Sequence, residues 1–537
     1  MKRPIYLLSI IYNYYQYLSI YIGLLSLLFI PVGLLFSRGL LSVGFITFIS
    51  NWVLEGGYKQ KWILLKQQKA EMIISLIFLL HLVGMAYTSN IGYGLADLKI
   101  KLPLLFPIFL FSYFKLSKII KADIFLYLFA FSTVVSTLVG FIRFEYILKY
   151  QTVDDLKNIT FMGQNIMLSL FVNFSIFIFF HQLFLNWYKH SGFIRNLLII
   201  CVIWLIVFLY LLNSLTGYFT FGILVLYSII KLFKTYKRKL VIGLLVIFGI
   251  SAISSVIYVD QLISNFYLVD KINFQNLEKY TVNARKYENN LNSKRIENGH
   301  YIDIYICTQE LESEWKKQSQ MNLSGQDKKG QVLSETLIRY LTSKGLRKDS
   351  AGFKQLNGND ISYIENGCAN YKYISKYSLE ARIYNIIWQI NTYENTGNAN
   401  AQSISQRVEF YKSAIYIIRH HFWFGVGTGD VMDTFNKTLK EISPKLDEKY
   451  RNRVHNQFVV EFTALGIIGF VIFIIIIFYP VLKNKIWKEY LFSIFYLIIL
   501  ISFLTDNPLE TQLGVSFFSY FFCVLSLGFG KGFSSNL

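Results

Sequence analysis

Residues 407–430 read RVEFYKSAIYIIRHHFWFGVGTGD, and residues 451–470 read RNRVHNQFVVEFTALGIIGF. The first stretch joins an amphipathic helical pattern, which begins at Arg407, to a glycine-rich turn. The second places His455 and Asn456 immediately before a long apolar run. A histidine, several cations and a tight turn therefore meet at the edge of an apolar segment.

The composition is that of a helical membrane protein. Hydrophobic residues make up 54% of the 537 residues and charged residues only 16%, whereas soluble chains carry roughly 25% charged residues. The apolar residues form runs of roughly 20 residues, the length that crosses about 30 Å of hydrocarbon as a helix. We therefore predict an all-α polytopic membrane protein.

About twelve apolar runs meet this length criterion. They begin near Leu18, Leu40, Met72, Leu102, Ile124, Asn165, Leu197, Thr216, Leu240, Gln457, Tyr490 and Gln512. Residues 1–258 are predicted to form a membrane domain with spans 1–9, and residues 457–537 to add spans 10–12. The polar residues between them, 259–456, form one large loop.

The distribution of lysine and arginine predicts the orientation. Basic residues cluster after every second span, which places those connections and both chain ends in the cytoplasm. The large loop and the connection from Thr505 to Thr511 then lie on the outer side. This pattern explains the net charge of +20, so we expect no nucleic-acid partner. Lys2 and Arg3 precede no small-residue cleavage site, which favours a retained cytoplasmic end.

The large loop contains helical patterns from Gln331 to Ile390 and from Gln406 to His420. Gly345 is expected to end the first helix, and the Asn-rich stretch around Gly397 reads as a linker. Ser403 fits a capping box with the glutamine three residues later.

Arg407 lies in the first turn of the helix that follows, where the helix dipole does not favour a cation. A fixed cation there needs an anion, such as a phosphate or a carboxylate. The alternative is a solvated arginine that pairs with Glu409 or Glu461.

Gly425, Gly427 and Gly429 form a turn in which glycine permits positive φ and close backbone approach. No Lys-Ser/Thr follows, which argues against a nucleotide loop. We expect a tight re-entry loop whose following helix is capped by Asp430. A phosphate bound at that helix N-terminus is the alternative.

His455 follows Arg451 and Arg453 and precedes Asn456. Arg451 would lie one helical turn before His455 and share its face. A neighbouring cation disfavours the protonated imidazole, so His455 could accept a proton. A lone histidine at a membrane interface is more often an amphipathic anchor, so the functional interpretation depends on the convergence of these features.

These motifs resemble the signature of the O-antigen ligase and O-antigen polymerase family. The resemblance extends to residues 85–111, MAYTSNIGYGLADLKIKLPLLFPIFLF, and to residues 510–522, ETQLGVSFFSYFF. It implies a twelve-helix, metal-independent glycosyltransferase of the bacterial inner membrane, which needs no cofactor and acts at the periplasmic face. Such an enzyme moves a glycan from undecaprenyl diphosphate in the membrane lipid onto an acceptor, with inversion at the anomeric carbon.

The resemblance also implies residue roles. His455 would be the general base and Arg407 would bind the diphosphate. Further candidates for substrate contacts are Arg451, Arg453, Lys101, Asn456, Gly425 and Gly427.

The chain departs from the family in residues 213–219, NSLTGYF, where Leu215 replaces a family arginine that also binds the diphosphate. Lys99, Lys101 or Arg143 could substitute for it. The sequence contains no D-x-D pair and no metal-ligand spacing.

Three functions remain open. The chain could be a ligase that joins glycan to lipid A–core, or a polymerase or protein glycosylation enzyme, which differs only in the acceptor. A transporter of lipid-linked sugars would instead require ionisable residues buried within spans and paired half-repeats. Neither is evident in the sequence. Cys307 and Cys368 share the large loop and could pair there or remain thiols.

Overall fold

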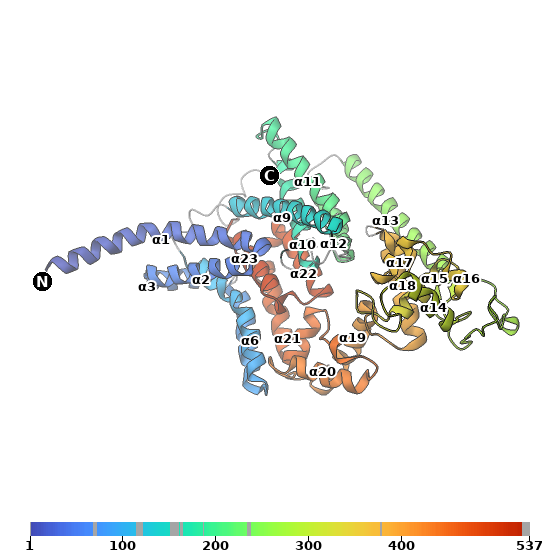
Figure 1. The fold of residues 1–537 in the computed structure, drawn as a ribbon. Coiled ribbons are helices and arrows are strands. Elements are labelled where there is room, and N and C mark those ends of the chain that lie inside the picture. Colours follow the sequence, from blue (N-terminus) through green and yellow to red (C-terminus); the bar gives the residue numbers. More distant parts are fainter. Residues whose placement is uncertain are drawn as a thin grey trace.

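The computed structural model describes residues 2–67, 72–113, 122–150, 161, 165–185, 187–232, 238–375 and 378–528. Helices dominate this part of the chain, and the regular strands β1 (Ile296–Glu297) and β2 (His300–Tyr301) form one small antiparallel sheet. Figure 1 shows a helical bundle with the large loop folded beside it.

Six described helices are long and apolar enough to cross a membrane. They are α1 (Lys2–Phe36, apolar from Leu18), α9 (Ala122–Tyr150), α10 (Asn165–Leu185), α11 (Gly192–Leu211), α13 (Arg238–Tyr267) and α21 (Gln457–Lys483). A seventh candidate is the pair α2 (Arg38–Glu55) and α3 (Tyr58–Gln67), which is bent by 115°.

Four further apolar helices are shorter, at 10–17 residues. They cover Ile73–Tyr87, Leu215–Lys231 in α12 (Leu215–Leu232), Tyr490–Thr505, which is α22, and Gln512–Ser526 in α23 (Gln512–Gly528). A polytopic helical membrane protein therefore fits the structure, and the number twelve stays a prediction.

Aromatic side chains fill the centre of the bundle. Phe517 and Phe521 of α23 contact Phe129 of α9, Phe174 of α10 and Phe495 of α22, with ring centroids 4.8–6.2 Å apart. Large aromatic groups bury much apolar area and favour such edge-to-face and offset pairs. The last apolar helix thus forms the core around which its neighbours pack.

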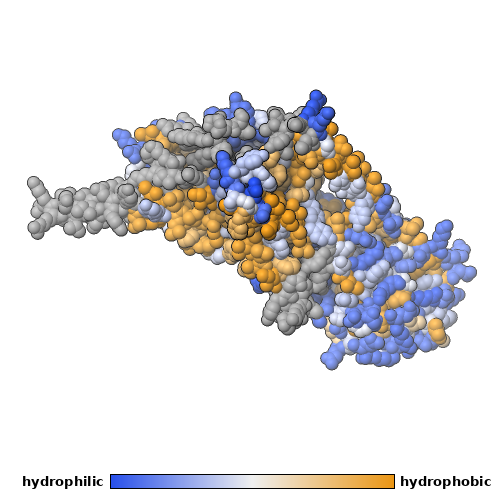
Figure 2. All heavy atoms as spheres, turned by 90° about the horizontal axis from the view of Figure 1, so that it is seen from above, coloured by the Kyte–Doolittle hydropathy of each residue, from blue (hydrophilic) through white to orange (hydrophobic). Residues whose placement is uncertain are grey.

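Helix α13 lies at the margin of the bundle and leads into the large loop (Figure 1). Only 6% of its most apolar stretch is buried in the protein, so its isoleucines are available to lipid. It continues to Tyr267, where Phe266 contacts Tyr384 of the loop with ring centroids 4.9 Å apart. Figure 2 shows hydrophobic residues over the bundle and hydrophilic residues over the loop.

The loop has its own core. Helices α14 (Thr308–Gln318), α15 (Leu333–Ser343), α16 (Ser350–Phe353) and α17 (Gly358–Glu365) enclose Trp315, Tyr340 and Phe353, which are all buried. Helix α15 ends before Gly345, whose φ is 70°, so the predicted end is confirmed. Cys307 and Cys368 are both buried thiols.

Two helices connect this core to the membrane part: α18 (Leu379–Thr396) and α19 (Ser403–His420). Helix α18 continues past Ile390 and ends at Gly397, which adopts the left-handed conformation. The predicted capping box at Ser403 is wrong, because Ser403 is already helical and the cap residue is Gln402. The Gln389 side chain of α18 instead accepts from the Ile404 N–H at 3.1 Å.

Candidate active site

His455 faces an acidic partner from another part of the chain. It lies in the non-helical segment before α21, and its Nδ1 is 3.1 Å from Asp506 Oδ1. Asp506 directly follows α22. The two side chains are 31% and 23% exposed, so the pair lies at the protein surface within reach of a substrate. Sequence reasoning did not identify Asp506, although the Thr505–Thr511 connection was predicted on the same side of the membrane as His455.

Arg407 of α19 approaches the same carboxylate. Its Nη1 donates to the Thr505 carbonyl at 3.4 Å. Burial raises the pKa of Asp506, but the hydrogen bond from His455, the Asn507 backbone N–H and the charges of His455 and Arg407 outweigh it, so the pKa is lowered. An ionised Asp506 therefore accepts from Nδ1–H and leaves Nε2 of His455 as the nitrogen that can accept a proton.

Neighbouring helices hold the imidazole in place. The ring of Phe410, one turn after Arg407 on α19, lies 6.1 Å from the His455 ring between centroids. Asn456 caps α21 by accepting from the Val459 N–H at 3.2 Å. Its amide nitrogen lies 3.2 Å from the Tyr411 hydroxyl and from the Leu504 carbonyl. Asn456 thus ties together three helices.

Arg451 does not share a face with His455, and that prediction is wrong. Residues 451–455 are not helical, because α21 begins only at Gln457 with Asn456 as its cap. The Arg451 Nε instead donates to the Leu446 carbonyl at 3.1 Å. Arg407 is instead a cation whose charge acts on Asp506, the partner of His455.

Arg453 points inward. Its Nη1 donates to Glu510 at 2.7 Å and to the Tyr93 hydroxyl at 3.3 Å. Burial lowers its pKa, but Glu510, Tyr93 and Asp97 outweigh burial and raise it. With its amide oriented to satisfy both neighbours, Asn507 accepts from Arg453 Nε and donates to Asp506 Oδ1, each at 2.9 Å. Arg453 therefore helps to position Asp506 through Asn507.

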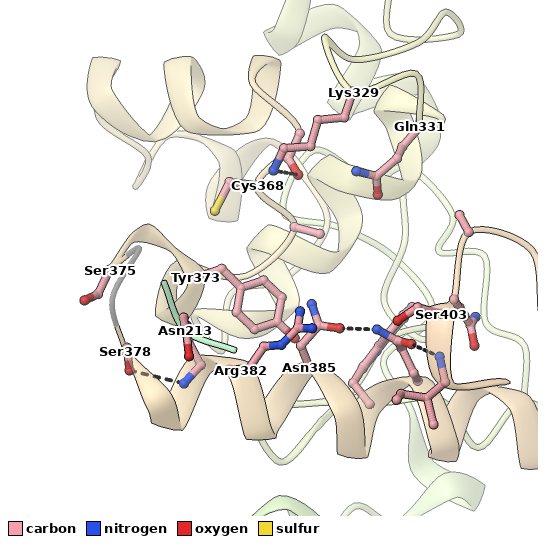
Figure 3. A pocket seen from close by; sticks show the side chains of 18 of the residues that line it. Asn213, Lys329, Gln331, Cys368, Tyr373, Ser375, Ser378, Arg382, Asn385 and Ser403 are labelled. Carbon is pink, nitrogen blue, oxygen red and sulfur yellow. Dashed lines mark hydrogen bonds between the residues drawn. The ribbon is translucent and has the colours of Figure 1, made fainter. Parts of the chain in front are cut away.

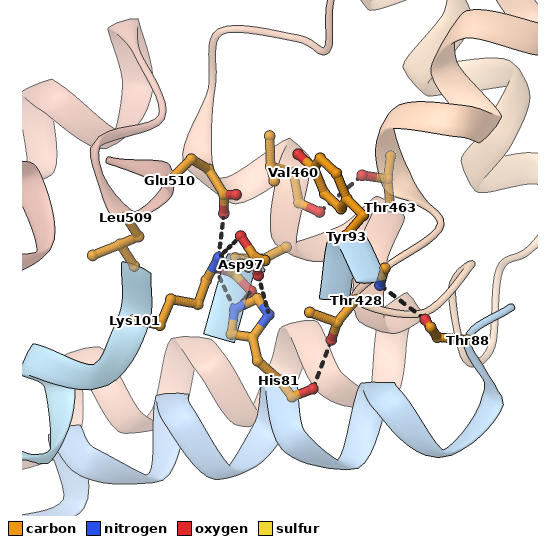
Figure 4. A network of polar contacts seen from close by, with 12 residues as sticks. His81, Thr88, Tyr93, Asp97, Lys101, Thr428, Val460, Thr463, Leu509 and Glu510 are labelled. Carbon is orange, nitrogen blue, oxygen red and sulfur yellow. Dashed lines mark hydrogen bonds and ion pairs between the residues drawn. The ribbon is translucent and has the colours of Figure 1, made fainter. Parts of the chain in front are cut away.

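Lys101 belongs to a buried cluster of charges, shown in Figure 4. It is fully buried, and its Nζ lies 2.7 Å from Asp97 and 2.9 Å from Glu510. His81 pairs with Glu461 at 3.2 Å in the same region. With two carboxylates already bound, Lys101 is not oriented toward a phosphate in this structure. The cluster also contradicts the expectation that no ionisable residues are buried among the apolar helices.

The glycine-rich turn packs into a break in α21. Gly466 has a φ of 65° and interrupts the helix, which frees the carbonyls of Thr463 and Ala464 for the N–H groups of Val426 and Gly427, each at 2.9 Å. Gly425 and Gly427 have φ values of 71° and 91°. The expected tight loop is therefore present.

The backbone N–H groups of residues 425–429 all donate within the protein. They are thus not available to a phosphate in this structure. Asp430 is the N-cap residue of the following helix α20 (Val431–Ile442), as predicted, but its side chain makes no capping hydrogen bond there. Its carboxylate accepts from the Ser89 and Asn90 N–H groups at 2.7 Å, at the start of α6 (Ile91–Lys101).

A cavity of about 860 Å³ lies between α18, α19 and the turn at residues 212–216. Arg407 and Leu215 both line it, whereas His455 does not. Lys99 and Arg143 are exposed elsewhere and do not line it either. Arg407 thus stands between the cavity and the His455–Asp506 pair.

These features define a class: a polytopic helical membrane protein with a histidine–carboxylate pair and an arginine-lined cavity beside its bundle. Residues 373–474 match the family model for O-antigen ligase, and this match supports membership of the O-antigen ligase family. The match contains Arg407, the glycine turn and His455 but not Asp506. No curated protein matches the chain.

Proposed function

We propose that this protein is a glycosyltransferase that moves a glycan from undecaprenyl diphosphate to an acceptor hydroxyl at the periplasmic face of the bacterial inner membrane. The family match supports a glycosyltransferase of the O-antigen ligase or polymerase type. The observation that best supports the residue roles is the 3.1 Å contact between His455 and Asp506, with Arg407 beside it.

In the proposed reaction, Nε2 of His455 takes the proton of the acceptor hydroxyl while that oxygen attacks the anomeric carbon. The bond between this carbon and the diphosphate oxygen breaks, and the electron pair leaves with undecaprenyl diphosphate. Attack from the opposite face inverts the configuration. Asp506 stabilises the imidazolium that forms, and the planar fork of Arg407 binds the phosphate oxygens as their charge grows.

The acceptor defines the physiological role. A ligase would use a hydroxyl of lipid A–core, which we favour because the family model is that of O-antigen ligase. A polymerase would use the growing glycan, and a protein glycosylation enzyme a side-chain hydroxyl. The same base and the same leaving group serve all three.

Buried ionisable residues are also typical of transporters, and the cluster around Lys101 is such a feature. Its charges pair with one another, and Arg453 with Asn507 connects them to Asp506. We therefore assign the cluster to supporting the active site.

The test uses purified full-length protein in nanodiscs with an undecaprenyl diphosphate-linked glycan. We expect release of undecaprenyl diphosphate together with a new glycosidic bond when lipid A–core is supplied. A parallel series with free glycan and with peptide identifies the acceptor. If no acceptor is glycosylated and the donor instead crosses the bilayer of proteoliposomes, the protein is a transporter.

A further inference from the structure

The cavity beside Arg407 joins the large loop to the membrane part. Its walls come from α18, the start of α19, residues 362–375 and the membrane turn at 212–216. Figure 3 shows Arg382, Asn385 and Tyr373 side by side in it, with Asn213 contributed by the membrane part. At about 860 Å³ it is within the usual range for ligand sites.

The lining is strongly cationic. It contains Lys329, Arg339, Arg382 and Arg407, and none of its described residues is Asp or Glu. Arg339 is already neutralised, because it pairs with Glu297 at 2.9 Å and stacks on Trp388 at 3.5 Å. Within the described chain the guanidinium of Arg382 has no hydrogen-bond or ion-pair partner, and it is exposed to the cavity. An arginine in that state is suited to an anionic ligand.

Unpaired polar atoms point to the same ligand site. Five lining residues each carry a buried polar atom that has no hydrogen-bond partner in the described part of the chain: Asn165 Oδ1, Asn213 Oδ1, Asn366 Oδ1, Tyr373 Oη and Trp388 Nε1. Buried polar groups are nearly always paired. These donors and acceptors therefore favour a ligand rich in hydroxyl groups, such as a sugar.

The two arginines are held in a fixed relation. Gln389 of α18 accepts from the first turn of α19 at 3.1 Å and donates to Asn385 at 2.6 Å. Arg382, Asn385 and Gln389 follow one another at helical spacing and share a face of α18. That face is the one turned to the cavity, which Arg407 lines from α19.

We propose that Arg382 is a second diphosphate-binding residue, which acts with Arg407 on the phosphate-bearing end of the lipid-linked glycan, and that the uncharged polar lining binds the adjoining sugars. This inference rests on the proposed function. Leu215 supplies no charge at the cavity, and Lys101 is paired with two carboxylates. Among the other lining cations, Lys329 donates to the Gly367 carbonyl and Arg339 pairs with Glu297, so Arg382 is the one placed to assist Arg407.

The experiment measures binding of undecaprenyl diphosphate to the full-length protein in nanodiscs. We expect Arg382→Ala to raise Kd about 10-fold or more, as for the loss of a charge-assisted hydrogen bond. Arg382→Lys should recover part of the lost affinity, and Arg407→Ala should raise Kd as much as Arg382→Ala does. Arg382→Ala should raise the Kd of undecaprenyl monophosphate by a smaller factor, because this lipid carries only one phosphate. Arg419→Ala is the control, since Arg419 is exposed on α19 and does not line the cavity.

Unchanged Kd in Arg382→Ala, with an unchanged unfolding temperature, would overturn the inference. So would an equal loss of binding to vesicles of phosphatidylglycerol, because Arg382 would then bind any lipid phosphate. His455→Ala separates the two proposals: it should bind undecaprenyl diphosphate normally but not transfer glycan. If His455→Ala transfers glycan, the proposed function fails whatever Arg382 does.

Discussion

At the scale of single residues, the proposed mechanism gives Asp506 and His455 complementary roles in accepting the proton of the acceptor hydroxyl. The carboxylate is ionised and accepts from Nδ1, and the imidazole thereby presents Nε2. Asp506→Asn keeps the size of the side chain but removes the negative charge that stabilises the imidazolium. We expect turnover to fall about 10²-fold or more, with binding of undecaprenyl diphosphate unchanged. Initial rates of glycan transfer check this, and equal rates in the variant would exclude Asp506 from the mechanism.

The sequence predicts roles for His455 and Arg407 because both belong to a short local motif that resembles the family signature, and these roles stay predictions. It did not identify Asp506, since 51 residues and two helices separate it from His455. The sequence prediction also treated residues 451–455 as helical, although the helix begins only after Asn456. This stretch is charged and has no apolar periodicity, so the sequence does not show where the helix begins. Arg451 was therefore placed beside the imidazole instead of Arg407.

At the scale of elements, the break in α21 receives the glycine turn. A Cβ on Gly466 would lie 2.4 Å from the backbone of Trp423 and Phe424, at a φ of 65°. Gly466→Ala should lower the free energy of unfolding by about 1–3 kcal/mol from backbone strain alone. Gly222→Ala in α12 is the matched control, because nothing lies within 4 Å of its added Cβ. Thermal unfolding in detergent distinguishes them, and equal unfolding temperatures would show that the break is not needed.

The buried charges join α6, α21 and the connection after α22. Burial raises the pKa of Glu510, but Lys101, Arg453 and His81 outweigh burial and lower it. Its contribution to stability is thus present above the ordinary glutamate pKa of about 4.3 and is lost as the pH falls through the lower folded pKa.

Glu510→Gln should therefore cost about 3–5 kcal/mol at pH 7, because it leaves Arg453 buried without its carboxylate. The variant should also lose less stability than the unmodified protein on acidification below pH 4. Unfolding temperatures measured across pH give both results. Glu312→Gln, which removes an exposed pair with Lys316, should change neither. A Glu510→Gln protein as stable as the unmodified one would show that the cluster does not hold these elements together.

At the scale of the whole molecule, the composition and the lengths of the apolar runs were sufficient to predict a helical membrane protein. They were not sufficient to predict the number of spans. Several apolar helices are shorter than a bilayer requires, and α2 with α3 bends by 115°. The buried charges were missed for a related reason: Lys101, Glu461 and Glu510 lie far apart in the sequence, and only the fold brings them together.

The orientation of the large loop is a prediction from the basic connections. Ser324 is exposed on the loop, so Ser324→Cys should react with membrane-impermeant thiol reagents in cells with a permeabilised outer membrane. Lys237→Cys, in a basic connection, should be protected until the inner membrane is opened. The reverse pattern would place the loop and its site in the cytoplasm.

The central claim is that His455 is the base of a glycan transfer reaction. Its most direct test is the rate at which purified His455→Ala protein moves glycan from undecaprenyl diphosphate to acceptor. We predict a loss of about 10²–10⁴-fold, with an unchanged unfolding temperature, because a partly exposed histidine buries little surface. Full turnover in the His455→Ala protein would contradict the account.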